Sequence, residues 1–293
     1  MVDNQNSMDV KGFFDTDTNT ISYVVTDKKT AICAVIDSVL DLDYASGNIK
    51  YENVDKIVDF ITENHLKLEW LVETHVHADH LSAAPYIQQK LGGRIAISKE
   101  IVHVQKIFGK IFNAGTEFER DGSQFDLLLN DGDSYSIGNL QAKAIHTPGH
   151  TPACMAHMIE DCVFVGDTLF MPDGGTARAD FPGGDARVLY RSIQKILALP
   201  DETRLFVCHD YMPEGRKVEW ETTVAEQKNN NIHIGGAISE DEFVKLRETR
   251  DVTLGMPKLI MPSIQVNMRA GHMPPSEDDG KTYLKVPISG IKG

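Results

Sequence analysis

The chain has 293 residues, of which 41% are hydrophobic and 25% are charged, an ordinary balance for a globular protein. Its formal net charge of −14 argues against nucleic acid or an anionic membrane as the main partner, because both bind basic surfaces. No apolar run approaches the roughly 20 residues that a membrane-spanning helix needs. The polar start, residues 1–8, resembles no signal peptide, so we expect a cytoplasmic protein.

The first third of the chain alternates β-rich runs with amphipathic segments. Thr20–Thr26 and Ala31–Ile36 are predicted to be paired strands, separated by a polar turn. Apolar residues recur at helical spacing in the segments that follow, and glycines at 92 and 93 are typical of a helix end. The spacing predicts helices over 53–65, 81–91 and about 100–110, with strands at 66–72 and 94–98.

The middle third is richer in strands. Strands are predicted at 127–129, 134–137, 140–147, 154–159, 162–165 and 204–208, with a helix over 185–199. Ser239 and Glu242 form a capping box that begins another helix. Residues 256–280 are rich in Pro and Gly and are expected to be an irregular tail. Two packed sheets with helices outside, an αββα sandwich of the α+β class, fit this pattern best.

Four cysteines stand singly in apolar, strand-like surroundings, and no C-x-x-C pair occurs. We expect reduced thiols in the core and no disulfides. The four are Cys33, Cys154, Cys162 and Cys208.

Residues 74–80 read T-H-V-H-A-D-H directly after the predicted strand 66–72. His75 and His77 are two residues apart, so on an extended segment both rings project to the same side. Asp79 and His80 follow where the chain must turn. A single histidine here would be an ordinary core residue, but four buried ligands need partners. The heptapeptide therefore predicts a metal site.

Three more predicted strands end in polar groups that could bind metal. They are followed by His146-Thr-Pro-Gly-His150-Thr, by Gly166-Asp167-Thr168 and by His209-Asp210-Tyr211. Each alone would be read as a solvated turn. Four such endings in one chain favour a common site, because loops at strand ends carry most reactive groups.

This order of motifs resembles the metallo-β-lactamase superfamily over about residues 15–215. The resemblance implies an αββα fold in one domain, residues 1–293, with a C-terminal helix and Pro-rich tail in about 216–293. Residues 175–181, G-T-A-R-A-D-F, resemble a segment of the persulfide dioxygenases, and 262–271 are similar to that family's C-terminal signature. Ala270 replaces a common Cys, and the stretch 111–125 and the end after Gly271 resemble a longer bacterial branch that includes β-lactamase hydrolase-like proteins.

In that family one Fe(II) is held by two histidines and an aspartate, which here are His75, His150 and Asp167. The implied reaction is oxidation of glutathione persulfide by O2 to sulfite and glutathione, in sulfide detoxification. Residues that orient these ligands through hydrogen bonds are expected nearby. They are His77, Asp79, His80 and His209.

The same residues could instead hold two Zn²⁺ ions. His75, His77 and His150 would bind one, and Asp79, His80 and His209 the other, with Asp167 bridging. Such a pair activates water, as in a thioesterase of the glyoxalase II type. Ligand types do not separate these alternatives.

Three further residues are candidates for contacts with the substrate. The Tyr211 hydroxyl could donate to bound substrate or oxygen, although a core aromatic anchor is an equal alternative. Arg178 and then Arg269 are candidates for pairing with a glutathione carboxylate, and a structural salt bridge is the alternative for Arg269. His146 is expected to be structural. The family likeness suggests a homodimer, and the Pro-rich tail is a reasonable place for a subunit contact.

Overall fold

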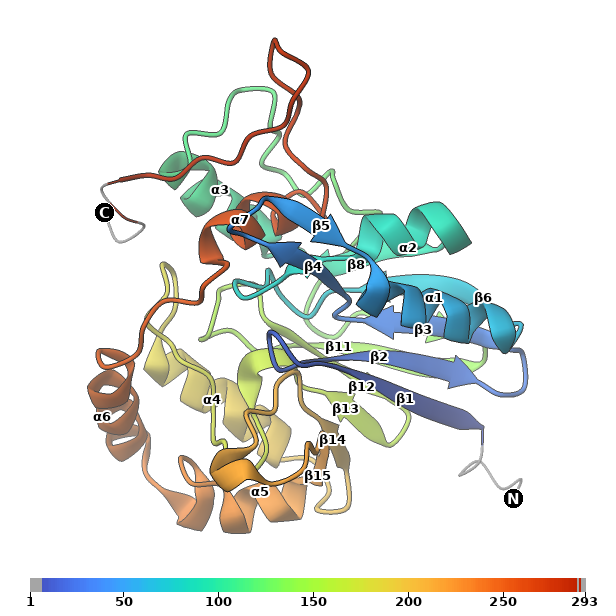
Figure 1. Cartoon of the computed structure of the whole chain (residues 1–293). Helices are drawn as coiled ribbons and strands as arrows, with labels where there is room; N and C mark the ends of the chain where they lie inside the picture. The colour runs from blue at the N-terminus through green and yellow to red at the C-terminus, as the bar shows by residue number, and fades with distance from the viewer. Residues whose placement is uncertain (1–6, 289, 291–293) are drawn as a thin grey trace.

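Two six-stranded β-sheets pack face to face, and helices cover both outer faces of this pair (Figure 1). The computed structural model describes residues 7–288 and 290, so the first six residues of the polar start lie outside it. The strand orders are β1-β2-β3-β6-β8-β9 and β10-β11-β12-β13-β14-β15, and β5-β4-β7 form a small third sheet. The αββα prediction is therefore confirmed.

The strands and α-helices have the following bounds. The strands are β1 (Met8–Asp15), β2 (Thr20–Asp27), β3 (Ile32–Ile36), β4 (Val39–Asp43), β5 (Asn48–Lys50), β6 (Lys67–Val72), β7 (Leu81–Ser82), β8 (Arg94–Ser98), β9 (Leu127–Leu129), β10 (Ser134–Ile137), β11 (Leu140–His146), β12 (Met155–Ile159), β13 (Cys162–Phe164), β14 (Arg204–Phe206) and β15 (Glu221–Thr223). The helices are α1 (Glu52–Glu63), α2 (Ala84–Leu91), α3 (Ile101–Ile111), α4 (Ala186–Leu197), α5 (Val224–Asn230), α6 (Glu240–Asp251) and α7 (Ile260–Asn267).

Three apolar layers hold these elements together. The central layer lies between the two sheets and includes Tyr23, Trp70 and Phe164. One outer layer packs α1, α2, α3 and α7 against the first sheet, and the other packs α4, α5 and α6 against the second (Figure 1). Burial of apolar side chains is the main stabilising contribution in such a sandwich.

Most predicted elements are present with ends that agree to within three residues, and β2 and β3 pair antiparallel as expected. The four cysteines are free and buried, which also agrees with the prediction. The helix expected over 81–91 is shorter, because Leu81 and Ser82 pair with β4 as β7. Helix α2 begins at Ala84, and Pro85 sits in its first turn, where proline fits without loss of a hydrogen bond.

The prediction of an irregular tail over 256–280 is wrong in part, because this segment contains a helix. Residues 260–267 form helix α7, which is buried in the apolar layer that covers the outer face of the first sheet. Pro262 is in the first turn of this helix, where the missing N–H would have no partner in any case. Proline content therefore misled the prediction, and tertiary burial of Ile260, Ile264 and Val266 explains the helix.

Among residues 7–288 and 290, no helix is long and apolar enough to cross a membrane.

Candidate metal centre

The predicted ligands come from four separate strand ends, and the fold brings them to one place. The heptapeptide follows β6 of the first sheet. The other three segments follow β11, β13 and β14 of the second sheet. A hydrogen bond from Met155 N to Thr74 O (2.9 Å) and one from Ile21 N to Cys208 O (2.8 Å) connect the two sheets at this edge. The centre therefore lies where the sandwich opens.

Two glycines allow the ligand-bearing turns to approach their neighbours closely. Gly149, just before His150, has φ +135°, and a Cβ there would lie 2.3 Å from backbone atoms of Leu189 in α4. Gly166, just before Asp167, has φ +52°, and a Cβ there would lie 2.7 Å from the Thr74 hydroxyl. Both positions need glycine because a side chain would push the ligand out of place.

His75, His150 and Asp167 form one compact group of buried donors. The Nε2 atoms of His75 and His150 lie 3.8 and 3.5 Å from Asp167 Oδ2. The Nδ1 of His150 lies 2.7 Å from the carbonyl oxygen of Arg178, which can only accept, so this nitrogen carries the proton. The Nε2 of His150 faces Asp167 and is the ring nitrogen available to a metal.

The proton on His75 is located by a similar chain of hydrogen bonds. The Thr74 hydroxyl donates to Asp37 Oδ2 (2.8 Å), so it accepts from the Nδ1 of His75 (3.0 Å). Burial holds the pKa of His75 well below its usual value, and the nearby histidines His77 and His150 lower it further. His75 is therefore neutral and presents its Nε2 lone pair to the same point as His150, as a metal ligand must.

A second group of donors lies on the other side of Asp167. The Nε2 of His209 is 3.3 Å from Asp167 Oδ1 and 3.7 Å from Asp79 Oδ2. His80 Nδ1 is 3.2 Å from Asp79 Oδ2. In the described part of the chain, His80 Nε2 and Asp167 Oδ1 are buried atoms without a hydrogen-bond partner. Buried nitrogen and oxygen atoms without a hydrogen-bond partner are suited to coordinate a cation.

His77 is held by two buried carboxylates. Its Nε2 lies 3.0 Å from Asp37 Oδ1 and 3.4 Å from Glu73 Oε2. Burial would lower the pKa of His77, but these carboxylates raise it well above its usual value. Its Nδ1 is buried and has no hydrogen-bond partner among the described residues. His77 can therefore either orient its neighbours or offer Nδ1 to a metal.

Asp37 and Glu73 were not predicted. Asp37 also accepts from Thr74 N at 2.8 Å, and it follows β3 directly. The polar residue at the end of an apolar strand was the signal that identified the other ligands, and it could have identified Asp37. Glu73 accepts a hydrogen bond from the Ser82 hydroxyl at 2.5 Å, and no local pattern indicates this contact.

The C-terminal signature has a structural role at this site. The side-chain amide of Asn267, at the end of α7, donates to the carbonyl oxygens of His77 (2.9 Å) and His80 (2.8 Å). Its oxygen accepts from Ser82 N at 2.8 Å. Asn267 therefore holds the heptapeptide in its bent shape.

The two predicted arginines have other partners. The Arg178 guanidinium forms a bidentate pair with Asp180 (2.6 and 3.0 Å) and donates to Gly255 O (2.6 Å). Three of the five N–H groups of Arg178 are therefore used within the chain, and its role as a carboxylate binder stays a prediction. Arg269 is buried and lines a cavity that none of the predicted metal ligands lines, so the structure does not support it as a substrate contact at the metal.

Tyr211 lies beside the metal ligands, as predicted. Its ring stacks on His209 (centroids 5.8 Å apart) and packs edge-on against Phe170 (5.7 Å), while about half of the residue is exposed. Its exposure excludes a role as a core anchor. His146 lies outside the ligand groups, and its Nε2 is 2.8 Å from Pro152 O, in agreement with a structural role.

The donor set of imidazole nitrogens and carboxylate oxygens suits Fe(II) and Zn²⁺ alike. The residues present therefore fit a metal ion, and the ligand types leave its identity open.

Comparison with known proteins agrees with this geometry. The chain is 53% identical over 97% of its length to the whole of a Burkholderia pseudomallei (strain 1710b) protein named a probable metallo-hydrolase. It is 50% identical to a beta-lactamase hydrolase-like protein of Agrobacterium fabrum, again over 97% of this chain, and covers 65% of that relative's length.

More distant relatives include the human mitochondrial persulfide dioxygenase ETHE1, which is 30% identical over 88% of this chain and 86% of its own. The crystal structure of ETHE1 from Myxococcus xanthus superposes with a TM-score of 0.71 at 29% identity, covering 90% of this chain and all of that one. The model of the metallo-beta-lactamase superfamily matches residues 15–209, which contain all of the predicted ligands. The chain therefore belongs to the metallo-beta-lactamase superfamily.

Proposed function

We propose that this protein is a non-haem iron persulfide dioxygenase. It would convert glutathione persulfide, O2 and water into glutathione, sulfite and two protons. The outer sulfur is oxidised by four electrons and O2 is reduced by four, and the S–S bond breaks with the inner sulfur leaving as the thiol of glutathione. This class of reaction removes sulfide-derived sulfur.

The observation that carries the proposal is the group His75, His150 and Asp167. Two imidazoles whose Nδ1 hydrogen bonds are defined present their Nε2 atoms toward one carboxylate oxygen. Two histidines and one carboxylate are the ligands of many oxygen-using Fe(II) enzymes, and they leave coordination positions open. Bound Fe(II) would supply a redox-active centre at which the substrate sulfur and O2 meet. The likeness to relatives named persulfide dioxygenase supports the same choice.

The residues of this chain would orient the substrate and hold protons. Partial burial and the nearby carboxylates Asp167 and Asp79 raise the pKa of Tyr211, so its hydroxyl stays protonated near neutral pH and can donate to an anionic sulfur or to oxygen. The stack on His209 and Phe170 fixes the ring at the rim of the site. Asp37 and Arg178 O hold the ligand imidazoles in the required tautomers through the hydrogen bonds described above.

A two-zinc hydrolase is the second candidate, and one observation favours it. The two oxygens of Asp167 face different groups, with Oδ2 toward His75 and His150 and Oδ1 toward His209. A carboxylate so placed could bridge two metals that activate water. The names of the more similar relatives point the same way.

Oxygen uptake by the Fe(II)-reconstituted protein, supplied with glutathione persulfide, tests the proposal. We expect uptake with formation of sulfite, and Asp167→Ala should abolish both iron content and uptake. His209→Ala separates the candidates by metal content, because a one-iron enzyme keeps its single metal while a two-metal hydrolase loses one of its two ions. His103→Ala, an exposed histidine outside the site, is the matched control. Iron-loaded protein without uptake would overturn the dioxygenase proposal.

A further inference from the structure

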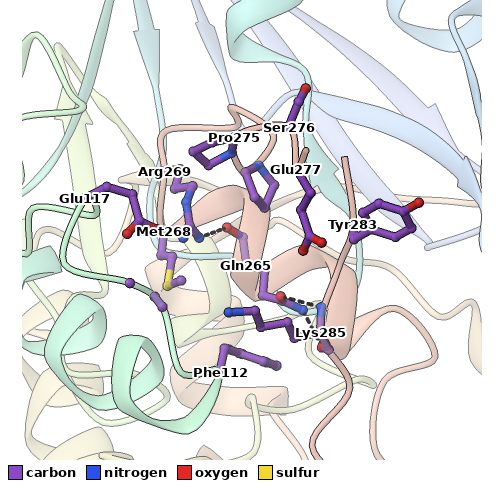
Figure 2. A pocket seen from close by; sticks show the side chains of 13 residues that line it. Phe112, Glu117, Gln265, Met268, Arg269, Pro275, Ser276, Glu277, Tyr283 and Lys285 are labelled. Carbon is purple, nitrogen blue, oxygen red and sulfur yellow. Dashed lines mark hydrogen bonds between the residues drawn. The ribbon is translucent and has the colours of Figure 1, made fainter. Parts of the chain in front are cut away.

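None of the predicted metal ligands lines a cavity of about 270 Å³, and two of its walls come from segments that supply no residue to the metal centre. One wall is the loop after α3, which includes Phe112 and Glu117, and the other is the C-terminal tail over 274–285. The end of α7 supplies the floor (Figure 2). These walls are the stretch 111–125 and the end after Gly271, in which the sequence departs from the persulfide dioxygenase pattern. The cavity is therefore a feature of this longer chain.

Arg269 is the central polar group of the cavity. It is 8% exposed, its guanidinium stacks on the Phe118 ring at 4.2 Å, and its Nη1 donates to Gln265 O at 2.7 Å. An arginine has five N–H groups, and the described residues accept a hydrogen bond from one of them. No Arg269 nitrogen is among the buried atoms that lack a partner, so its free N–H groups face accessible space, which is this cavity.

A buried guanidinium without a carboxylate partner is costly to a protein, and such groups are normally paired. Among residues 7–288 and 290, no carboxylate lies within 4.0 Å of an Arg269 nitrogen. Burial lowers the pKa of Arg269, and the more distant Glu117 carboxylate acts in the opposite direction. Guanidinium N–H groups bind carboxylates in a bidentate manner. The missing partner of Arg269 is best supplied by the carboxylate of a ligand.

The rest of the lining restricts what that ligand can be. Glu117 and Glu277 bring carboxylates to the two rims, and Figure 2 shows Arg269 between the loop of Glu117 and the tail of Glu277. A cationic group on the ligand would meet them. Phe112 and Met268 form apolar wall that suits a hydrocarbon side chain, together with Pro274 and Pro275. The volume is just below the usual range for drug-sized ligands, so the ligand is small.

We propose that this cavity binds a small zwitterionic amino acid with an apolar side chain. Its carboxylate pairs with Arg269, and its ammonium group lies near Glu277 and Glu117. The Lys285 ammonium does not compete with Arg269 for the ligand carboxylate, since it donates to Asn113 O at 2.8 Å.

Three matched compounds test this assignment by isothermal titration calorimetry on the full, metal-loaded chain. L-Norleucine carries both charged groups, hexanoate lacks the ammonium and pentylamine lacks the carboxylate. We expect norleucine to bind, hexanoate to bind about tenfold more weakly and pentylamine to give no measurable heat. The same titration on metal-free protein shows that the amino acid is not simply bound to the metal, because binding at the cavity persists.

Two variants with controls locate the binding. Arg269→Gln should weaken norleucine binding by about 10- to 100-fold. Glu277→Gln should reduce norleucine affinity to the level of hexanoate, and because Glu277 is exposed this variant should fold normally. Arg250→Gln and Asp278→Asn, exposed residues that do not line the cavity, should bind as the wild type does. Absence of norleucine binding at millimolar concentration, or unchanged binding in a folded Glu277→Gln protein, would overturn the proposal.

Discussion

Asp37 is expected to hold the metal ligands in place, although it does not bind the metal in either proposed scheme. It accepts hydrogen bonds from the Thr74 backbone N–H and hydroxyl, both at 2.8 Å, and it lies 3.0 Å from His77 Nε2. Asp37→Asn is the sharpest perturbation. Asp37 has φ +52°, a conformation that Asn adopts at least as readily as Asp, so the backbone is not strained by this change.

The cost of Asp37→Asn follows from the contacts. The variant keeps one acceptor oxygen, but its NH2 group must face either the Thr74 hydroxyl or the His77 N–H, both of which donate. Removing one partner from a buried, hydrogen-bonded charge pair costs about 3–5 kcal/mol. For a chain of this size we expect the melting temperature to fall by roughly 10 °C. Because the Thr74 hydroxyl orients His75, we also expect metal affinity to fall by about 10- to 100-fold.

Urea unfolding of metal-free protein measures the stability term, and competition with a chelator measures metal affinity. Asp9→Asn, an exposed aspartate on β1, is the matched control and should change neither. If Asp37→Asn unfolded within about 1 kcal/mol of the wild type, the buried network would not support the centre as argued.

Three further outcomes are expected. Asp251→Asn leaves one acceptor oxygen for two donors, Ala179 N and the buried Arg247 guanidinium, next to the carbonyl that orients His150, so metal retained after dialysis should fall several-fold. Burial lowers the pKa of His157 from 6.5 to about 4. This histidine stays neutral when folded but protonates when unfolded, so stability that is complete above pH 6.5 is lost as pH falls toward 4. His157→Asn should reduce this loss by about 3 kcal/mol in urea unfolding. Tyr211→Phe should lower kcat and leave metal content unchanged, because the stack on the site is kept while the hydroxyl is lost.

Each of these has an outcome that contradicts it. Metal retention equal to the wild type in Asp251→Asn would show that the α6 contact does not position the ligand. A pH profile of stability unchanged by His157→Asn would mean that another group accounts for the acid sensitivity. Full steady-state activity of Tyr211→Phe would leave the hydroxyl without a part in the reaction.

The amino-acid sequence by itself determined which residues could bind a metal and which elements carry them. His75, His150 and Asp167 follow apolar strands, and strand and helix periodicity is a local property that a single sequence displays. The glycines before His150 and Asp167 also belong to local motifs, although their reason, close approach to Leu189 and Thr74, is visible only in the fold.

Tertiary structure decided which atoms of those residues face one another. The protons on His75 and His150 are located by Asp37, through Thr74, and by the carbonyl of Arg178, and these contacts join segments far apart in the chain. The same holds for the surroundings of the two predicted arginines. Arg178 is paired with Asp180, and Arg269 lies in a separate cavity.

Helix α7 shows the physical reason for this division. Its sequence, with Pro262 and the β-branched residues Ile260, Ile264 and Val266, has weak local preference for helix, yet burial of these apolar side chains in the core outweighs that preference. Local sequence determines which conformations of each segment are low in free energy. The long-range packing that closes the sandwich then selects among them and chooses the partners of every buried polar group.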